Sequence, residues 1–413
     1  MTIDISWKLL NNLEGEYGDS FYLLGLNSFK RNYHEFLEAF RHIYPNTNIA
    51  YSYKTNYVPK LCQVVNALGG YAEVVSRMEY DLARRVGVPP ERIIYNGPYK
   101  CESDIKEALL SGAVVNIDGP YEVDIVKGVA REAPNHNLLV GLRCNFDVGT
   151  DYTSRFGFDV HGDQFRTALE ALNGIDNCLV AGFHCHFLPP NRSVEAYATI
   201  ALRMIELFKD HFSDTHPGFI DLGGGFFSRM SPDLRKQFLC HVPDFREYAE
   251  AIGSQFAHAF PENSGPMLIL EPGIAITADV MRFVAKVIDI KKVGSRTVAL
   301  VSGSIYNIKP TLNDKNLPLI VMSNNPKSEI RNEPVDLVGY TCMESDRLYS
   351  AYEGPLSVGD YVIFSNVGAY TVVLKPPFIH PCPVILAYDP DSKELSVIKH
   401  RETFSDVFST YEF

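Results

Sequence analysis

The chain contains 413 residues, of which 46% are hydrophobic and 21% are charged, and its formal net charge is -12. At roughly 150 residues per domain, this length predicts two domains, or one large barrel with a smaller domain. The composition is typical of a globular enzyme, and no basic stripe offsets the negative charge, so we expect no nucleic-acid-binding surface.

The apolar runs are shorter than the ~20 residues that cross a bilayer, and the first residues lack the pattern of a signal peptide, so we expect a cytoplasmic protein without membrane contact. The eight cysteines lack zinc-type spacing, so we expect reduced thiols and no metal site.

Strand-like and amphipathic helical segments alternate along the first two thirds of the chain. This repetition predicts a (β/α)₈ TIM barrel, in which the carboxyl ends of the strands meet at one face. We predict strands over 47–53, 71–76, 92–95, 113–117, 138–141 and 178–186, and helices over 58–68 and 77–86.

Lys54 directly follows the first predicted barrel strand, where a buried ammonium has no ordinary structural purpose. A desolvated lysine loses basicity and becomes a nucleophile that can form a Schiff base with an aldehyde, as in enzymes that use pyridoxal 5′-phosphate (PLP). The alternative is a lysine whose ammonium extends from the strand end into solvent.

Further strand ends supply other groups that a PLP site needs. His186 offers a flat ring that can stack on a pyridine, although a metal-binding pair with His184 or a histidine satisfied in the core are alternatives. The strand 219–222 runs into three glycines, which let backbone N–H groups close on a phosphate, especially where such a loop opens a helix; a flexible turn is the alternative. Glu271 follows the apolar strand 267–270, where its carboxylate can keep a pyridine nitrogen protonated.

The pattern changes after about residue 280. Strands such as 282–288 and 360–364 alternate with Pro, Gly and Asn turns, which predicts a β-domain. Segments 339–346 and 367–371 add a thiol, carboxylates and a phenol.

In this order and spacing, the segments resemble the fold-type III PLP decarboxylases, the family of diaminopimelate decarboxylase and ornithine decarboxylase. Segments 72–76, 141–145 and 154–157 extend the resemblance over nearly the whole chain. The resemblance implies a PLP-binding (β/α)₈ barrel over residues 29–278 and a β-domain formed by residues 1–28 and 279–413.

The resemblance also implies roles for individual residues. Lys54 would hold PLP as a Schiff base, His186 would stack on its ring, and Glu271 would pair with the ring nitrogen. Cys342 would act in the active site of the partner subunit and protonate the carbanion, so a homodimer would share its active sites. The remaining cofactor-binding residues would be Gly223, Gly224, Gly225, Tyr370, Arg143 and Ser76.

Two departures from the family pattern affect the phosphate side. Ile274 stands where the family has an arginine, and Pro189 stands where it has a serine. We hypothesise that Arg192 or Ser193, in the same loop as Pro189, restores part of the anion site; the alternative is a solvent-facing arginine.

Other departures affect the substrate. Met343 replaces an acidic residue that meets a distal ammonium, Glu344 is one residue away, and Lys309 replaces an arginine that binds a distal carboxylate. Asn313 stands where a tyrosine is common. We expect the substrate to be contacted by Lys309, Met343, Glu344, Asp346 and Arg192.

The sequence therefore predicts PLP-dependent decarboxylation of an amino acid. The substrate would resemble diaminopimelate, ornithine or lysine, or would be a modified or carrier-protein-attached amino acid. A catalytically inactive regulator on the same scaffold and an amino-acid racemase are the alternatives.

Overall fold

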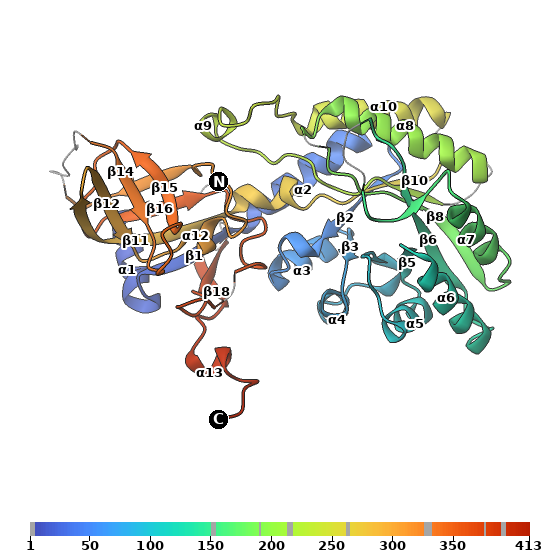
Figure 1. The fold of residues 1–413 in the computed structure, drawn as a ribbon, viewed down its shortest axis with the longest axis horizontal. Coiled ribbons are helices and arrows are strands. Elements are labelled where there is room, and N and C mark those ends of the chain that lie inside the picture. The colour runs from blue at the N-terminus through green and yellow to red at the C-terminus, as the bar shows by residue number, and fades with distance from the viewer. Residues whose placement is uncertain are drawn as a thin grey trace. The chain divides into compact units, whose positions relative to one another are not determined.

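The computed structural model describes residues 5–149, 154–189, 191–212, 218–261, 265–325, 333–375, 377–389 and 394–413. The chain divides into two compact units (Figure 1). The barrel unit comprises Tyr33–Phe227 and Cys240–Ala275, and the β-unit comprises Met1–Asn32, Ser228–Leu239 and Ile276–Phe413.

Among the described residues, eight parallel strands form a closed barrel, because each strand pairs with the next and the last pairs with the first. This confirms the predicted (β/α)₈ fold. A short strand, β7 (Phe158–Asp159), extends the sheet beside one of the eight. The eight are β2 (Thr47–Ser52), β3 (Tyr71–Val74), β4 (Ile93–Tyr95), β5 (Val114–Ile117), β6 (Leu138–Asn145), β8 (Cys178–His184), β9 (Phe219–Asp221) and β10 (Met267–Leu270).

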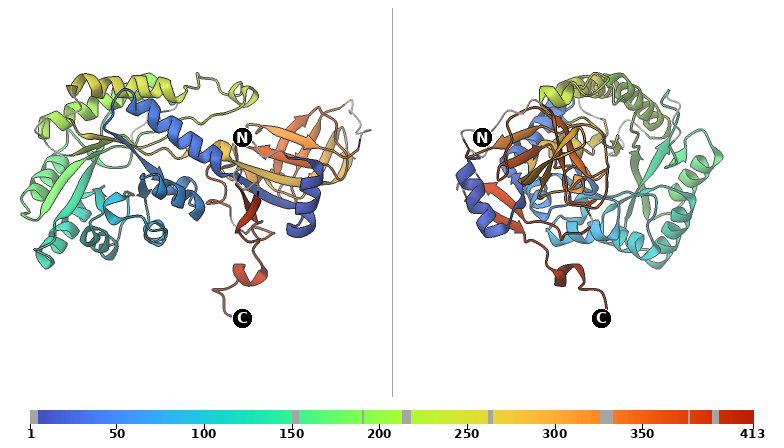
Figure 2. Two further views of the ribbon diagram at one scale, coloured as in Figure 1. Left: turned by 180° about the vertical axis from the view of Figure 1, so that it is seen from behind. Right: turned by 60° about the vertical axis from the view of Figure 1, so that its left-hand side comes forward.

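Helices of the barrel unit lie outside its strands (Figure 2). Some of them begin with residues that satisfy the free N–H groups of a helix start or that lack an N–H group: the Ser76 side chain caps α4, and Pro120 is the first residue of α6. Among the described residues, no helix combines the length and apolar character needed to cross a bilayer. The helices are α3 (Pro59–Ala67), α4 (Arg77–Arg85), α5 (Glu102–Ser111), α6 (Pro120–Glu132), α7 (Asp163–Asn173), α8 (Val194–His211) and α10 (Phe245–Ala259), and α2 (Leu26–Arg41) contains the division between the units.

The β-unit is built around a mixed sheet that includes the N-terminal strand. β1 (Ser20–Gly25) pairs antiparallel with β11 (Met281–Val293) and parallel with β17 (Ile385–Asp389). The core on one side of this sheet contains Leu10 of α1 (Trp7–Tyr17) and Phe21. The other strands are β12 (Arg296–Val301), β13 (Leu319–Met322), β14 (Val335–Val338), β15 (Arg347–Tyr352), β16 (Tyr361–Ser365) and β18 (Glu394–Lys399).

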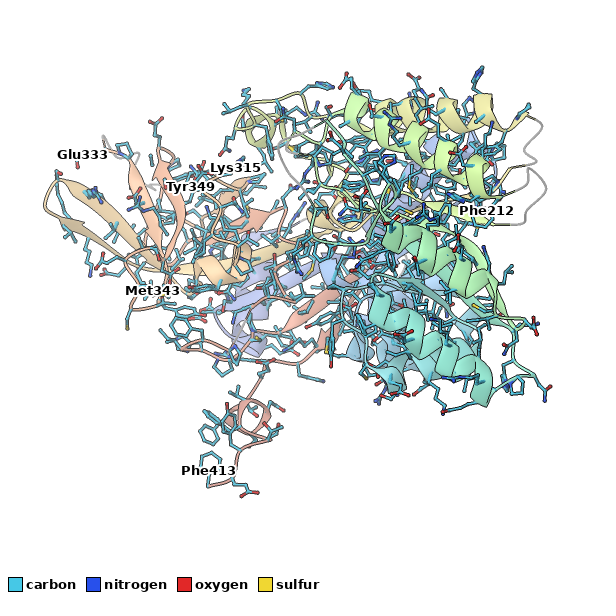
Figure 3. All side chains as sticks on the ribbon, turned by 45° about the vertical axis from the view of Figure 1, so that its right-hand side comes forward. Phe212, Lys315, Glu333, Met343, Tyr349 and Phe413 are labelled. Atoms are coloured by element: carbon cyan, nitrogen blue, oxygen red, sulfur yellow. The ribbon has the colours of Figure 1, made fainter. Side chains whose placement is uncertain are left out.

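Short helices complete the β-unit. The helix α13 (Phe404–Val407) and the residues that end at Phe413 project from the rest of this unit (Figure 3). The other short helices are α9 (Pro232–Arg235), α12 (Ile305–Ile308) and α11 (Ile274–Thr277), which contains a division between the units.

One segment differs from the expected division of the chain. Residues 228–239 were expected inside the barrel domain, but they belong to the β-unit. The side chain of Gln237 donates to the backbone oxygen of Asn316 at 2.9 Å and accepts from its N–H at 2.8 Å. The ammonium of Lys315 lies 5.0 Å from the ring centre of Phe238. These contacts, between residues far apart in sequence, were not apparent from local pattern.

Candidate active site

Lys54 lies just beyond the carboxyl end of β2, in the 3₁₀ turn Tyr53–Thr55. Its ammonium is 2.5 Å from a carboxylate oxygen of Glu73, and the Lys54 side chain is 31% exposed while the Glu73 carboxylate is buried. Ser52 donates to the same oxygen at 2.7 Å. The parallel register places Ser52 beside Glu73, so pairing of β2 with β3 brings the lysine to this carboxylate.

Buried amides connect this pair to Glu271, which follows β10. The amide of Asn96 donates to Glu73 at 3.1 Å and to Glu271 at 2.5 Å. The side-chain amide of Asn116 donates to the side-chain oxygen of Asn96 at 2.7 Å and so fixes the orientation of the Asn96 amide. A continuous polar network therefore runs from Lys54 to Glu271 across the strand ends inside the barrel.

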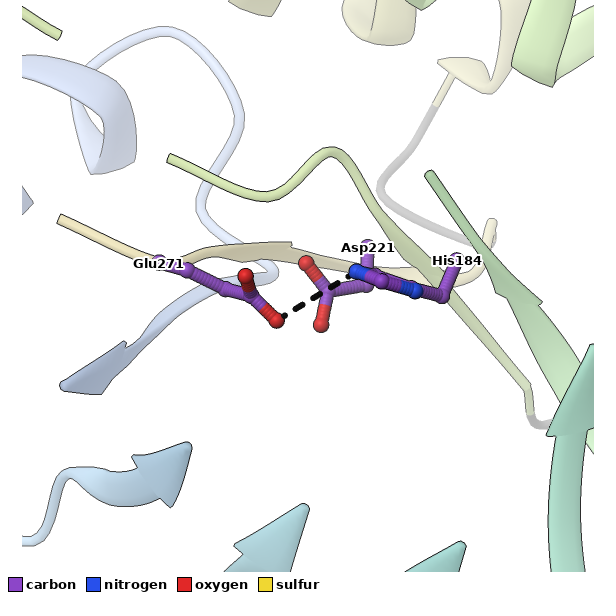
Figure 4. Close-up of side chains that lie close together, drawn as sticks. All are labelled: His184, Asp221 and Glu271. Atoms are coloured by element: carbon purple, nitrogen blue, oxygen red, sulfur yellow. Dashed lines mark ion pairs between the residues drawn. The ribbon is translucent and has the colours of Figure 1, made fainter. Parts of the chain in front are cut away.

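His184, Asp221 and Glu271 form a buried cluster on the adjacent strands β8, β9 and β10 (Figure 4). A ring nitrogen of His184 lies 3.5 Å from Glu271. Burial lowers the pKa of His184, whereas burial and the neighbouring Glu271 raise the pKa of Asp221. Burial therefore favours the neutral form of both neighbours of Glu271.

The same cluster contains polar atoms without partners. Neither ring nitrogen of His184 and only one oxygen of Asp221 has a hydrogen-bond partner among the described residues. A histidine and two carboxylates are also common metal ligands, with all three ligand atoms here within 4.8 Å of one another.

The glycine loop Gly223–Gly225 is tied to its neighbours by hydrogen bonds. Gly224 N donates to Nδ1 of His186 at 3.0 Å, and Gly223 N donates to Asp221 at 2.9 Å. A Cβ at Gly224 would lie 2.2 Å from the Glu271 carbonyl oxygen, so only glycine fits there. This loop does not open a helix directly, because the next described helix in the chain, α9, begins at Pro232.

His186 presents a neutral ring beside the glycine loop. It follows β8, is half-buried, and its Nδ1 accepts the Gly224 hydrogen bond. Burial and the nearby Lys54 ammonium lower the pKa of His186 to about 4. An uncharged aromatic ring in a fixed orientation is what stacking on a pyridine requires.

Two other residues that were predicted to contact the cofactor already have partners. Arg143, on β6, forms an ion pair with Asp118 at 3.0 Å, and its guanidinium lies 4.5 Å from the ring centre of Phe156. Ser76 caps α4 by accepting from the N–H of Glu79 at 3.3 Å. The Ser76 hydroxyl proton remains available to a ligand, because that bond uses only an oxygen lone pair.

In the β-unit, one loop carries most of the remaining predicted site residues. Cys342, Met343 and Glu344 are all exposed, and Met343 extends from the edge of the unit (Figure 3). The sulfur of Met343 accepts from the Tyr306 hydroxyl at 3.3 Å.

Asp346 has a different role from the predicted one. It is buried, and its carboxylate accepts from Ile305 N at 2.7 Å, Thr341 N at 3.0 Å and the Ser304 hydroxyl at 3.2 Å. Asp346 therefore holds the Cys342 loop against α12, and the prediction that it contacts substrate has no support.

Lys309 and Tyr370 lie in other loops of the β-unit. The Lys309 ammonium donates to the carbonyl oxygen of Lys315 at 2.8 Å, and burial lowers its pKa. Tyr370 is half-exposed and has a left-handed backbone with φ of 54°.

A protein-family model described as "Pyridoxal-dependent decarboxylase, pyridoxal binding domain" matches residues 26–278. The chain belongs to the pyridoxal-dependent decarboxylase family. The resemblance recognised in the sequence, and the enzyme class that it implied, are therefore confirmed.

Individual relatives agree with this family. A diaminopimelate decarboxylase of Aquifex aeolicus is 26% identical over 377 residues, which cover 87% of this chain and 84% of that protein. Antizyme inhibitor 2 of Xenopus laevis is 25% identical over 393 residues, which cover 91% of this chain and 82% of that protein. The crystal structure of the M. jannaschii diaminopimelate decarboxylase in complex with L-lysine shares the fold, with a TM-score of 0.84 and 22% identity. The match covers 97% of this chain and 94% of that one.

The barrel residues fit the cofactor of the pyridoxal-dependent decarboxylases. A primary amine, a buried carboxylate, a neutral aromatic ring and the glycine loop lie at the carboxyl ends of the barrel strands, and the unpartnered atoms of His184 and Asp221 lie beside Glu271. Of these residues, Lys54, His186, Glu271 and the glycines were predicted.

Five residues of the network and of the buried cluster were missed: Glu73, Asn96, Asn116, His184 and Asp221. The signal was present, since each is a polar residue at or near the carboxyl end of an apolar barrel strand.

Proposed function

We propose that this protein decarboxylates an amino acid with PLP bound at the carboxyl ends of its barrel strands. The observation that carries the proposal is the buried network that joins Lys54, through Glu73 and Asn96, to Glu271. The pyridoxal ring carries its aldehyde and its nitrogen at opposite ends. The Lys54 amine suits the aldehyde, and the Glu271 carboxylate at the other end of the network suits the nitrogen.

When bound, PLP supplies an electron sink for the carbanion that remains after carbon dioxide leaves. Lys54 is the amine that bonds to the cofactor, and Glu73 holds that amine at the strand end. Glu271 would pair with the ring nitrogen, since its carboxylate lies at the end of the polar network that begins at Lys54. His186 holds the ring from one face with an uncharged surface.

Cys342 is the proposed proton donor, acting in the active site of a partner subunit. Its exposure, on a loop held by Asp346, supports a role at a surface where a second copy binds. Mixing Lys54→Ala with Cys342→Ala subunits tests this arrangement, since neither variant alone has a complete site. Random mixing should restore about one quarter of wild-type activity, because half the dimers are mixed and each has one intact site. No recovery would contradict shared sites.

We propose that the substrate is an L-lysine-like or diaminopimelate-like amino acid, or one whose distal group is modified or attached to a carrier protein. The name of the Aquifex relative and the L-lysine bound to the M. jannaschii enzyme support the first class. Met343 and Lys309 favour a substrate whose distal group is modified or attached to a carrier. The Met343 thioether carries no charge, and the Lys309 ammonium already donates to a backbone oxygen, so neither offers a free charge to a charged distal group. Carbon dioxide release from free and N-acylated diamino acids distinguishes the classes.

The proposed location is the cytoplasm. All eight cysteines are unpaired, which supports a reducing compartment.

A second candidate function is that of a non-catalytic regulator. It is favoured by the similarity to antizyme inhibitor 2, whose identity to this chain nearly equals that of the Aquifex relative. Ile274 and Pro189, which replace the family's arginine and serine, agree with it. A racemase is a third possibility, and it predicts loss of optical activity in the amino acid without carbon dioxide release.

The first experiment is a visible absorbance spectrum of the purified protein with PLP, before and after borohydride reduction, followed by peptide mapping. An adduct on Lys54 supports the decarboxylase proposal, with carbon dioxide release as the next assay. Lys60→Ala is the matched control, because Lys60 is an exposed lysine on α3 and its loss should leave the adduct unchanged. Absence of any adduct at saturating PLP would move the conclusion to the regulator.

A further inference from the structure

We propose that Arg192 is the cationic residue that binds the PLP phosphate beside the glycine loop Gly223–Gly225. This inference rests on the proposed function and adds the residue that determines cofactor affinity.

The two loops pack together along successive residues. Gly224 donates to His186, and a Cβ at Gly225 would lie 2.9 Å from a side-chain carbon of Leu188. Further along, the Arg192 guanidinium lies 4.9 Å from the ring centre of Phe227. Arg192 therefore lies next to the end of the glycine loop, not in a separate surface segment.

The backbone of Arg192 is held in an unusual conformation. Its φ is 48°, a left-handed value that is uncommon for residues other than glycine. Its N–H donates to Pro189 O at 3.0 Å, and its carbonyl oxygen accepts from the Tyr248 hydroxyl at 2.7 Å. A strained residue that several contacts hold in place is characteristic of functional sites.

The glycine loop needs an additional group to bind a phosphate. The N–H groups of Gly223 and Gly224 are already engaged with Asp221 and His186. Among the described residues, Arg192 forms no ion pair with a carboxylate. A half-buried guanidinium with no counter-ion, beside a loop with few free donors, is suited to bind a dianion bidentately.

Two further features favour an anion at this position. Arg192 immediately precedes α8, whose N-cap is Ser193, and the 18-residue helix directs the positive end of its dipole toward the loop. The Arg192 charge also acts to lower the pKa of Tyr197, whose hydroxyl donates to Gly224 O at 2.9 Å, although burial raises that pKa overall.

The test compares PLP and pyridoxal, which lacks the phosphate, in binding titrations of the full-length protein. Arg192→Gln should weaken PLP binding by about 10- to 100-fold and leave pyridoxal binding unchanged, because it removes a charged hydrogen-bond donor to phosphate. Arg192→Lys should retain most of the affinity, since it keeps the charge. Arg203→Gln is the control: it removes an exposed arginine of α8 that pairs with Glu206.

Two results would overturn the inference. One is equal PLP affinity in wild type and Arg192→Gln; the other is an equal loss of PLP and pyridoxal binding, which would show a structural role. Thermal unfolding of each variant without ligand checks that it is folded.

Competition by inorganic phosphate separates this inference from the proposed function. Phosphate binding that requires Arg192, in a protein that forms no PLP adduct on Lys54, would support the anion site and refute the decarboxylase. If wild type binds neither phosphate nor PLP, both proposals fail.

Discussion

Replacing Gly224 with alanine tests whether the glycine loop must lie against Glu271. The new Cβ would lie 2.2 Å from the Glu271 carbonyl oxygen, whereas Cβ contacts below 3.0 Å essentially never occur. The loop and the strand end must therefore move apart by about 1 Å. Both groups are backbone, so no side-chain rotation can relieve the contact.

The movement would disturb three hydrogen bonds. Gly224 N donates to His186, Tyr197 donates to Gly224 O, and Glu271 N donates to Gly223 O at 2.7 Å. Overpacking of this kind costs about 1–3 kcal/mol, and a loss of 1.4 kcal/mol in binding is a tenfold change in affinity. We expect Gly224→Ala to lower the free energy of unfolding by about 1–3 kcal/mol and to weaken PLP binding at least tenfold.

Urea unfolding without ligand and PLP titration measure the two effects separately. Gly128→Ala, in the middle of α6, is the matched control because its new Cβ meets nothing within 4 Å. That substitution should stabilise the protein by about 0.5–1 kcal/mol, as for a glycine in a helix interior. A Gly224→Ala protein with wild-type stability and PLP affinity would refute the reasoning.

Three further predictions concern titration and catalysis. Burial raises the pKa of Glu79 to about 7, so between pH 4.5 and about 7 the folded protein binds more protons than the unfolded chain. The free energy of unfolding should fall by about 3 kcal/mol as the pH rises through this window, and Glu79→Gln should remove that fall in urea titrations; an unchanged pH dependence would contradict the assignment. Asp221→Asn should change PLP affinity only a few-fold, because burial raises the pKa of Asp221 and so favours a neutral form that asparagine resembles, whereas Glu271→Gln should slow carbon dioxide release by about tenfold or more; the reverse order would refute this difference between the two residues. Cys342→Ser should leave PLP binding intact and slow product protonation in a single-turnover assay, and loss of PLP binding would instead show a structural role.

Much of the barrel was predictable because its strands are short apolar runs at regular spacing. The predicted strand 47–53 and helix 77–86 differ from β2 and α4 by one residue each. The predicted strand 178–186 extended two residues beyond β8: Cys185 N still donates to Asp221 O of β9 at 2.8 Å, and His186 accepts from the glycine loop instead. Residues placed at strand ends were therefore brought together as expected.

The remaining site depended on contacts that local pattern does not encode. Glu73 and Asn96 meet because parallel register aligns their strands, and either residue alone looks like an ordinary polar residue. The hydrogen bonds of Asp346 were hidden for the same reason: a carboxylate four residues from a predicted catalytic thiol gives no sign that it accepts backbone hydrogen bonds. The left-handed backbone of Arg192 was equally invisible in sequence.

The pairing of β1 has a consequence for synthesis of the chain on the ribosome. Ser20 of β1 pairs with Ala285, and Tyr22 with Ile385, so β1 is made long before either partner strand. At about 5–20 residues per second, roughly ten seconds to a minute pass before the first partner emerges. All of Tyr33–Phe227 and Cys240–Ala275 is made in that interval and can fold first. During this time the nascent β1, whose Phe21–Leu24 side chains are all buried in the finished protein, is an exposed apolar segment that a chaperone would need to shield.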